Sequence, residues 1–199
     1  MGDIILVRHT EVSSNWKKRC YGVTDVPLSN AGQAAIKSIT SHLAKLQPQS
    51  IIHSGVSRTT LLAKAISLES NIHITEDKAF QELNFGSWEG CFWTDIFLSV
   101  GHDMGRLVSE PDIFSPPQGE TLYSMRDRVI KALLRIPNGI TTIVITHGGP
   151  IGAVSGTLRM ISAKDWPSLV PDYGSTLALN KTDLLRLHEI MKIRLLIQA

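Results

Sequence analysis

The chain has 199 residues, of which 43% are hydrophobic and 19% are charged, and its 20 basic and 18 acidic residues leave a net charge of +2. This composition is typical of a folded globular protein rather than a disordered segment, and the length predicts a single domain over residues 1–199. The small net charge excludes a basic protein that binds the nucleic-acid backbone. No stretch has the ~18 apolar residues of a membrane span, so we expect neither nucleic acid nor membrane as a partner.

The predicted elements alternate between strands and helices. Ile4–Val7 is short and wholly apolar, as in a strand buried on both faces. Ser29–Leu46 has apolar residues at steps of three and four, which predicts a helix with Ser29 as its N-cap. The further elements in chain order are a strand at Ile51–Ile52, helices at Ser57–Leu68 and Glu120–Ile136, a strand at Thr141–Thr146, and a helix at Ile151–Met160. This alternation predicts an α/β fold with a largely parallel sheet.

The stretch from Cys91 to Pro117 fits no regular period and contains two glycines and three prolines. We expect an insert or lid over one edge of the sheet. Cys20 and Cys91 are too few for a disulfide framework or a zinc site, so free thiols are expected. The four apolar residues near the N-terminus are too short for a signal-peptide core, which favours a cytoplasmic protein, either a monomer or a homodimer.

Basic side chains follow three of the predicted strands. They are Arg8 and His9 after the first strand, Arg58 shortly after the second, and His147 directly after the third. Ligands of an open α/β sheet bind beyond the carboxyl ends of its strands, so these side chains can converge. Two imidazoles and two guanidiniums form a cationic pocket that suits a phosphoryl group. Alone, Arg58 fits a surface helix residue equally well, and the glycines after His147 are weak evidence by themselves.

Several familiar motifs are absent from the sequence. It has no P-loop, no dinucleotide-binding fingerprint and no Gly-x-Ser-x-Gly elbow. No two histidines have the helical spacing of a metal site. We therefore expect no cofactor and no metal.

A series of short motifs resembles the histidine phosphatase superfamily, in that family's order. The motifs are Leu6–Glu11, Asn15, Gly22-x-x-Asp25-x-Pro27-Leu28, Gly32, Ser54-x-x-x-Arg58, Glu82–Gly90, Gly119-Glu120-Thr121 and Thr146–Gly149. Together they cover most of residues 4–152, whereas the tail after residue 160 adds little. The resemblance implies a phosphoglycerate-mutase-like fold, with three α/β/α layers around a mostly parallel sheet and a small lid.

The resemblance also implies a phosphomonoester hydrolase that works through a phosphohistidine. His9 would be the nucleophile, and Glu82 the acid that protonates the leaving group and then the base that activates water. Three further residues would hold the phosphoryl oxygens: Arg8, Arg58 and His147. Asn15 and Gly148 would complete the phosphate site, Ser54 would brace Arg58, and Glu120 would orient nearby backbone.

The segment Arg19–Leu28 resembles the branch of this family that contains the α-ribazole-5′-phosphate phosphatases. This implies a small-molecule phosphomonoester substrate, α-ribazole 5′-phosphate, dephosphorylated during nucleotide-loop assembly of adenosylcobalamin. A broad sugar-phosphate or nucleotide phosphatase remains an alternative. A phosphoglycerate mutase would be expected to have longer inserts than residues 91–117, and a non-catalytic phospho-ligand module would be expected to lack His9 or Glu82.

Overall fold

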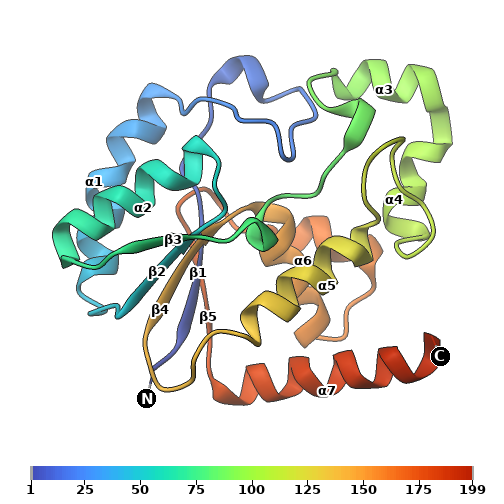
Figure 1. Ribbon diagram of the computed structural model, residues 1–199. Helices are drawn as coiled ribbons and strands as arrows, with labels where there is room; N and C mark the ends of the chain where they lie inside the picture. Colours follow the sequence, from blue (N-terminus) through green and yellow to red (C-terminus); the bar gives the residue numbers. More distant parts are fainter. Residues whose placement is uncertain (1, 199) are drawn as a thin grey trace.

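The computed structural model describes residues 2–198 and is built around a five-stranded sheet with the order β3-β2-β4-β1-β5 (Figure 1). Its strands are β1 (Ile4–Arg8), β2 (Ser50–His53), β3 (Ile74–Glu76), β4 (Thr142–Thr146) and β5 (Thr176–Leu179). The first four run parallel, and β5 is antiparallel to β1. The predicted α/β fold with a mostly parallel sheet is therefore confirmed.

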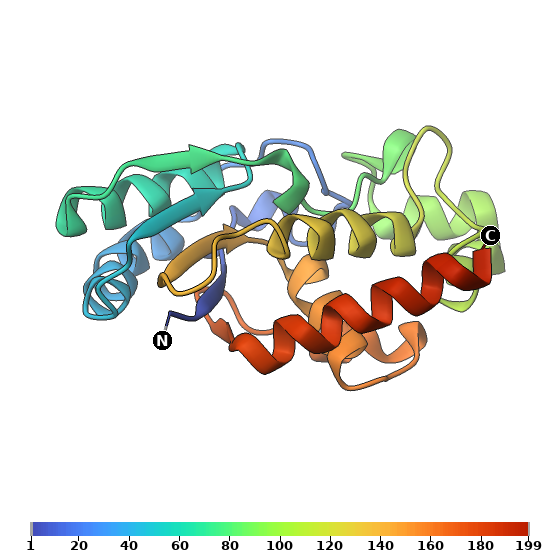
Figure 2. The ribbon, with the colours of Figure 1, turned by 60° about the horizontal axis from the view of Figure 1, so that its bottom comes forward.

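Two layers of helices enclose the sheet. Helices α1 (Asn30–Ala44) and α2 (Ser57–Ser70) lie on one side of the strands, and three helices lie on the other: α5 (Leu122–Leu133), α6 (Gly148–Leu158) and α7 (Lys181–Gln198) (Figures 1 and 2). Alternate residues of β1 divide between the two cores, because successive strand side chains point to opposite faces. Ile5 and Val7 pack with α1 and α2, whereas Ile4 and Leu6 pack with the three other helices. The three-layer arrangement is thus confirmed.

The start of α6 differs from the expectation. The helix begins at Gly148 rather than at Ile151, with His147 as its N-cap. The expectation was wrong because Pro150 lies in the first helical turn, where no helical partner exists for a backbone N–H and proline is tolerated. By contrast, the N-cap of α1 is confirmed, since the Ser29 hydroxyl accepts the N–H of Gly32 at 2.9 Å.

The stretch from Cys91 to Pro117 is more regular than expected. It contains helices α3 (Trp93–Val100) and α4 (Arg106–Ser109), and it lies to one side of the sheet, away from α1 and α2 (Figure 1). Ile96 packs with Trp88 and Cys20 in a small cluster separate from the two main cores. None of the helices within residues 2–198 is long and apolar enough to cross a bilayer.

Candidate active site

The imidazole of His9 lies directly beyond the carboxyl end of β1 and is 2% exposed. Its Nδ1 lies 2.7 Å from the backbone carbonyl oxygen of Thr10. Because a carbonyl can only accept, Nδ1 carries the ring proton and Nε2 holds a free electron pair. Burial, together with the nearby Arg58 guanidinium, lowers the pKa of His9 to about 3. The ring is therefore neutral at physiological pH, as a nucleophile must be.

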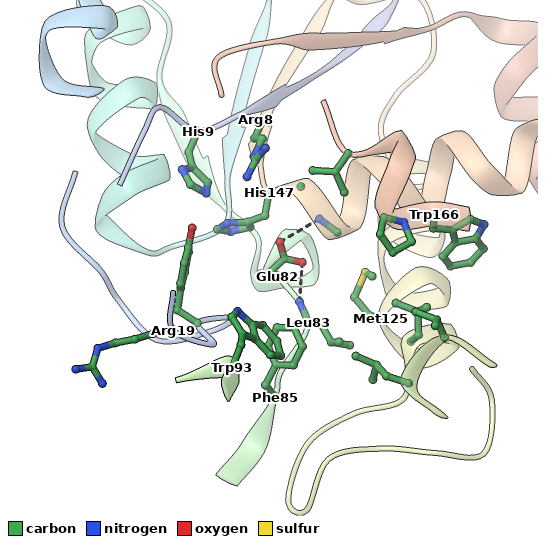
Figure 3. Close-up of a pocket in the computed structure, with 18 of the residues that line it drawn as sticks. Arg8, His9, Arg19, Glu82, Leu83, Phe85, Trp93, Met125, His147 and Trp166 are labelled. Carbon is green, nitrogen blue, oxygen red and sulfur yellow. Dashed lines mark hydrogen bonds between the residues drawn. The ribbon is translucent and has the colours of Figure 1, made fainter. Parts of the chain in front are cut away.

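Strand register brings His147 next to His9. Arg8 of β1 pairs with Thr146 of β4, so the residues that follow them leave the sheet side by side. The two imidazole rings meet edge to face, with centroids 5.2 Å apart. Burial, followed by the charge of Arg58, keeps the pKa of His147 well below its usual value. Figure 3 shows both rings at the top of one cavity.

Arg58 is held rigidly in the first turn of α2. Its guanidinium is fully buried and donates from Nη1 to the carbonyl of Thr24 at 2.7 Å and from Nη2 to that of Gly22 at 2.6 Å. The carboxylate of Glu89 in turn accepts the backbone N–H groups of Gly22, Val23 and Thr24. Glu89 therefore fixes the loop that fixes Arg58.

Arg8 is held by a segment far along the chain. Its Nη1 donates to the carbonyl of Pro171 at 2.6 Å, and its guanidinium stacks on the ring of Tyr173 at 3.9 Å. The Tyr173 hydroxyl is hydrogen-bonded to that of Tyr21 at 3.0 Å. The tail after residue 160, which adds little to the sequence resemblance, therefore positions one of the two guanidiniums beside His9.

Three buried nitrogen atoms around His9 have no hydrogen-bond partner: Arg8 Nε, Arg58 Nε and His147 Nδ1. Buried polar atoms are nearly always paired in native proteins, so these three point to a ligand that would contact them. They belong to the three residues expected to hold the phosphoryl oxygens. A tetrahedral oxyanion beside His9 would give each of them an oxygen.

Glu82 lines the same cavity, and its carboxylate lies close to His147 (Figure 3). One carboxylate oxygen accepts the backbone N–H of Leu83 and the other that of Gly149, both at 3.0 Å. The backbone carbonyl of Glu82 is itself held by Arg128 at 2.8 Å. These bonds fix the carboxylate inside the cavity, where a carboxyl group can exchange a proton with a bound ligand.

Beyond this polar floor, the cavity of about 480 Å³ has an apolar wall. Side chains from four separate segments form most of it: Phe85, Trp93, Leu107, Met125, Trp166 and Val170 (Figure 3). Trp93 and Leu107 come from the 91–117 stretch, which therefore contributes to this wall. Within residues 2–198, no group of three or more histidine, cysteine or acidic residues is placed to hold a metal ion.

Comparison with known proteins agrees with this geometry. The sequence pattern of the histidine phosphatase superfamily (branch 1) matches residues 4–183. The chain belongs to this superfamily. It is 29% identical over 157 residues to phosphoserine phosphatase 1 of Hydrogenobacter thermophilus, covering 77% of this chain and 74% of that one. It is 27% identical over 166 residues to a probable phosphoglycerate mutase of Escherichia fergusonii, covering 82% and 77%. The α-ribazole phosphatase of Shigella flexneri has the same fold, with a TM-score of 0.77, 18% identity and coverage of 89% and 90%.

Six of the seven residues expected in this histidine phosphatase site line the cavity: Arg8, His9, Arg58, Glu82, His147 and Gly148. The structure does not bring Asn15 to them, because it lies exposed in the short 3₁₀ helix Ser14–Trp16. Ser54 also differs from the expectation, since its hydroxyl bonds His147 rather than Arg58. Glu120 accepts the N–H of Asn84, in line with its expected role in orienting backbone.

Sequence reasoning missed Gly149 as a positioning residue. A Cβ at this residue would lie 2.1 Å from the Oε1 atom of Glu82, so only glycine leaves room for the carboxylate. We expect Gly149→Ala to lower kcat/KM roughly 10²-fold, the scale of an ångström-sized displacement of a catalytic group. Steady-state kinetics would measure this loss. Gly105→Ala, where a Cβ meets nothing within 4 Å, is the matched control, and an equal effect in both variants would contradict the assignment.

Proposed function

We propose that this protein is a phosphomonoester hydrolase that works through a phosphohistidine on His9. The observation that carries the proposal is the free Nε2 electron pair of a neutral His9, surrounded by three unpartnered nitrogen atoms. Nε2 attacks phosphorus and the bond to the leaving oxygen breaks, while Glu82 donates a proton to that oxygen. Glu82 then takes a proton from water, whose oxygen displaces His9 and releases inorganic phosphate. Arg8 and Arg58 supply the positive charge that balances the phosphoryl oxygens.

We further propose α-ribazole 5′-phosphate as the substrate, with the reaction placed in the cytoplasmic assembly of the cobalamin nucleotide loop. The apolar wall with Phe85, Trp93 and Trp166 supports this, because it offers aromatic contacts to a base attached to the sugar. The fold shared with the Shigella flexneri α-ribazole phosphatase is compatible with it. The two free thiols, Cys20 and Cys91, suit a reducing compartment.

Charge in the cavity argues against substrates that carry a carboxylate. Besides Arg8 and Arg58, the cations that line it are Lys17 and Arg19. Lys17 is paired with Glu11 at 2.7 Å. The guanidinium of Arg19 stacks on Phe92 at 3.8 Å and is turned away from Glu82 (Figure 3). Both cations already have partners, so the carboxylate of phosphoglycerate or phosphoserine would have to displace Glu11 from Lys17 or bind Arg19 beside Phe92.

A substrate panel tests this proposal. We expect α-ribazole 5′-phosphate to exceed ribose 5-phosphate and 3-phosphoglycerate roughly 10²-fold in kcat/KM, since burying an aromatic ring contributes about 3 kcal/mol. Trp93→Ala should lower the value for α-ribazole 5′-phosphate and leave that for ribose 5-phosphate unchanged. Equal rates across the panel would indicate a general phosphatase. Conversion of 3- to 2-phosphoglycerate would instead identify a mutase.

A further inference from the structure

The Nε2 atom of His147 begins a chain of hydrogen bonds that leads away from the cavity. Nε2 lies 2.8 Å from the hydroxyl oxygen of Ser54, which lies 3.0 Å from that of Thr59. The Thr59 hydroxyl lies 2.8 Å from the backbone carbonyl oxygen of Val56, the N-cap of α2. Ser54, Thr59 and His147 are at most 1% exposed, so water does not compete for these bonds.

The carbonyl oxygen of Val56, at the end of this series of hydrogen bonds, determines which atom donates in each of them. A carbonyl oxygen cannot donate, so the single hydroxyl proton of Thr59 points to Val56. The oxygen of Thr59 then accepts from Ser54, and the oxygen of Ser54 accepts from His147. The opposite direction would leave the oxygens of Thr59 and Val56 facing each other at 2.8 Å with no proton between them. The ring proton of neutral His147 therefore sits on Nε2, and Nδ1 is left as a bare electron pair.

The surroundings keep the ring neutral while the cavity holds no anion. Burial is the main cause that keeps the pKa of His147 well below its usual value, and Arg58 on α2, His9 just beyond β1, Arg128 on α5 and Arg8 on β1 add to it. The acidic group on this side is Glu82, which is bonded to the N–H of Gly149 two residues along the chain. An oxyanion would be repelled by the bare Nδ1 atom until that atom is protonated.

We infer that Ser54 and Thr59 are positioning residues that hold the ring proton of His147 on Nε2, so that an oxyanion is bound only together with one additional proton on Nδ1. If the proposed function is correct, this proton comes from a singly charged phosphomonoester or from solvent. In the complex, Nε2–H donates to Ser54 and Nδ1–H donates to a phosphoryl oxygen. The site then favours the protonated ester, and binding of the doubly charged ester consumes a proton.

Nitrogen NMR of the histidine rings tests this inference directly. The full chain, labelled with ¹⁵N at histidine, would be measured without ligand and with sulfate, an oxyanion that carries no proton at neutral pH; His147→Gln assigns the signals. We expect His147 to be protonated only on Nε2 in the free protein and on both nitrogens with sulfate. In Thr59→Val with sulfate, Ser54 is free to donate to Nε2, so we expect a neutral ring protonated on Nδ1.

Two further variants complete the test. Thr59→Ser restores the hydroxyl and should restore the wild-type spectra. Thr60→Val removes a neighbouring hydroxyl that bonds Val56 and His53 instead, and should change nothing at His147. A proton on Nδ1 in the free wild-type protein would overturn the inference, as would unchanged sulfate spectra in Thr59→Val. The free-protein spectra require no turnover, so they decide the matter even if no phosphomonoester is hydrolysed or Thr59→Val does not fold.

Discussion

Replacing His9 by alanine is expected to abolish the covalent phosphoenzyme and to lower kcat/KM roughly 10⁵–10⁶-fold, the scale of deleting a nucleophile. The two imidazoles differ in which nitrogen is bare: His9 holds its proton on Nδ1 against the carbonyl of Thr10 and has a free Nε2, whereas the Nε2 of His147 is bonded to Ser54. Rapid quenching with labelled substrate should trap a phosphoryl adduct that is labile in acid and stable in base. This adduct should be absent from His9→Ala.

The control for this loss is His73→Ala, which removes an exposed imidazole that does not line the cavity. It should leave both the adduct and the rate unchanged. An adduct that persists in His9→Ala would assign the nucleophile to another residue. An acid-stable adduct would mean a phosphoester, which a histidine cannot form.

Most residues of the candidate site could be predicted from the sequence because they lie at the ends of regular strands. A buried strand has an obvious apolar run, and whatever follows it must emerge at the same end of a parallel sheet. Arg8, His9 and His147 are directly tied to β1 and β4 in this way. Their convergence is then a consequence of strand register, which pairs Arg8 with Thr146.

The hydrogen bonds that hold these side chains in place could not be predicted in the same way. Arg8 bonds Pro171, a residue 163 positions away in an irregular segment with no period to indicate its path. The bonding partner of Ser54 was predicted wrongly for a similar reason. The hydroxyl is four residues before Arg58 in sequence, but the end of β2 lies beside that of β4, so its partner is His147.

Several elements were missed, three of them because their apolar residues do not keep to one face. In α7, Leu187 and Met191 are buried while Leu185 is 56% exposed. In α3, Ile96 is buried but Leu98 is 82% exposed. β5, the third of these elements, has only four residues, and most of them are not buried. Hydrophobic periodicity indicates a helix or strand only when the apolar residues lie on one face, so it did not indicate these three elements.

Glu82→Gln is expected to lower the rate by an amount that depends on the leaving group. A general acid matters when the leaving oxygen is too basic to depart as an anion, as for a sugar alkoxide but not for p-nitrophenolate. For an alkyl phosphate we expect a loss of roughly 10²–10⁴-fold in kcat/KM, the usual range for acid–base assistance. For p-nitrophenyl phosphate the loss should be much smaller. The comparison uses kcat/KM or the burst, because both report steps up to phosphoenzyme formation.

The ratio of the losses in kcat/KM for the two substrates shows whether Glu82 acts as an acid or only positions other groups. In the structure both oxygens of Glu82 accept backbone N–H groups, from Leu83 and Gly149. A glutamine can accept only one of these bonds, so the variant also disturbs the side chain's placement, but that disturbance affects both substrates alike. Glu110→Gln, which changes the carboxylate that follows α4 as its C-cap and is paired with Arg106, is the control and should affect neither substrate. Equal losses for the two leaving groups in Glu82→Gln would make Glu82 a positional residue. Another acid would then be needed, although Glu89 and Glu120 are both already bonded to backbone N–H groups outside the cavity wall.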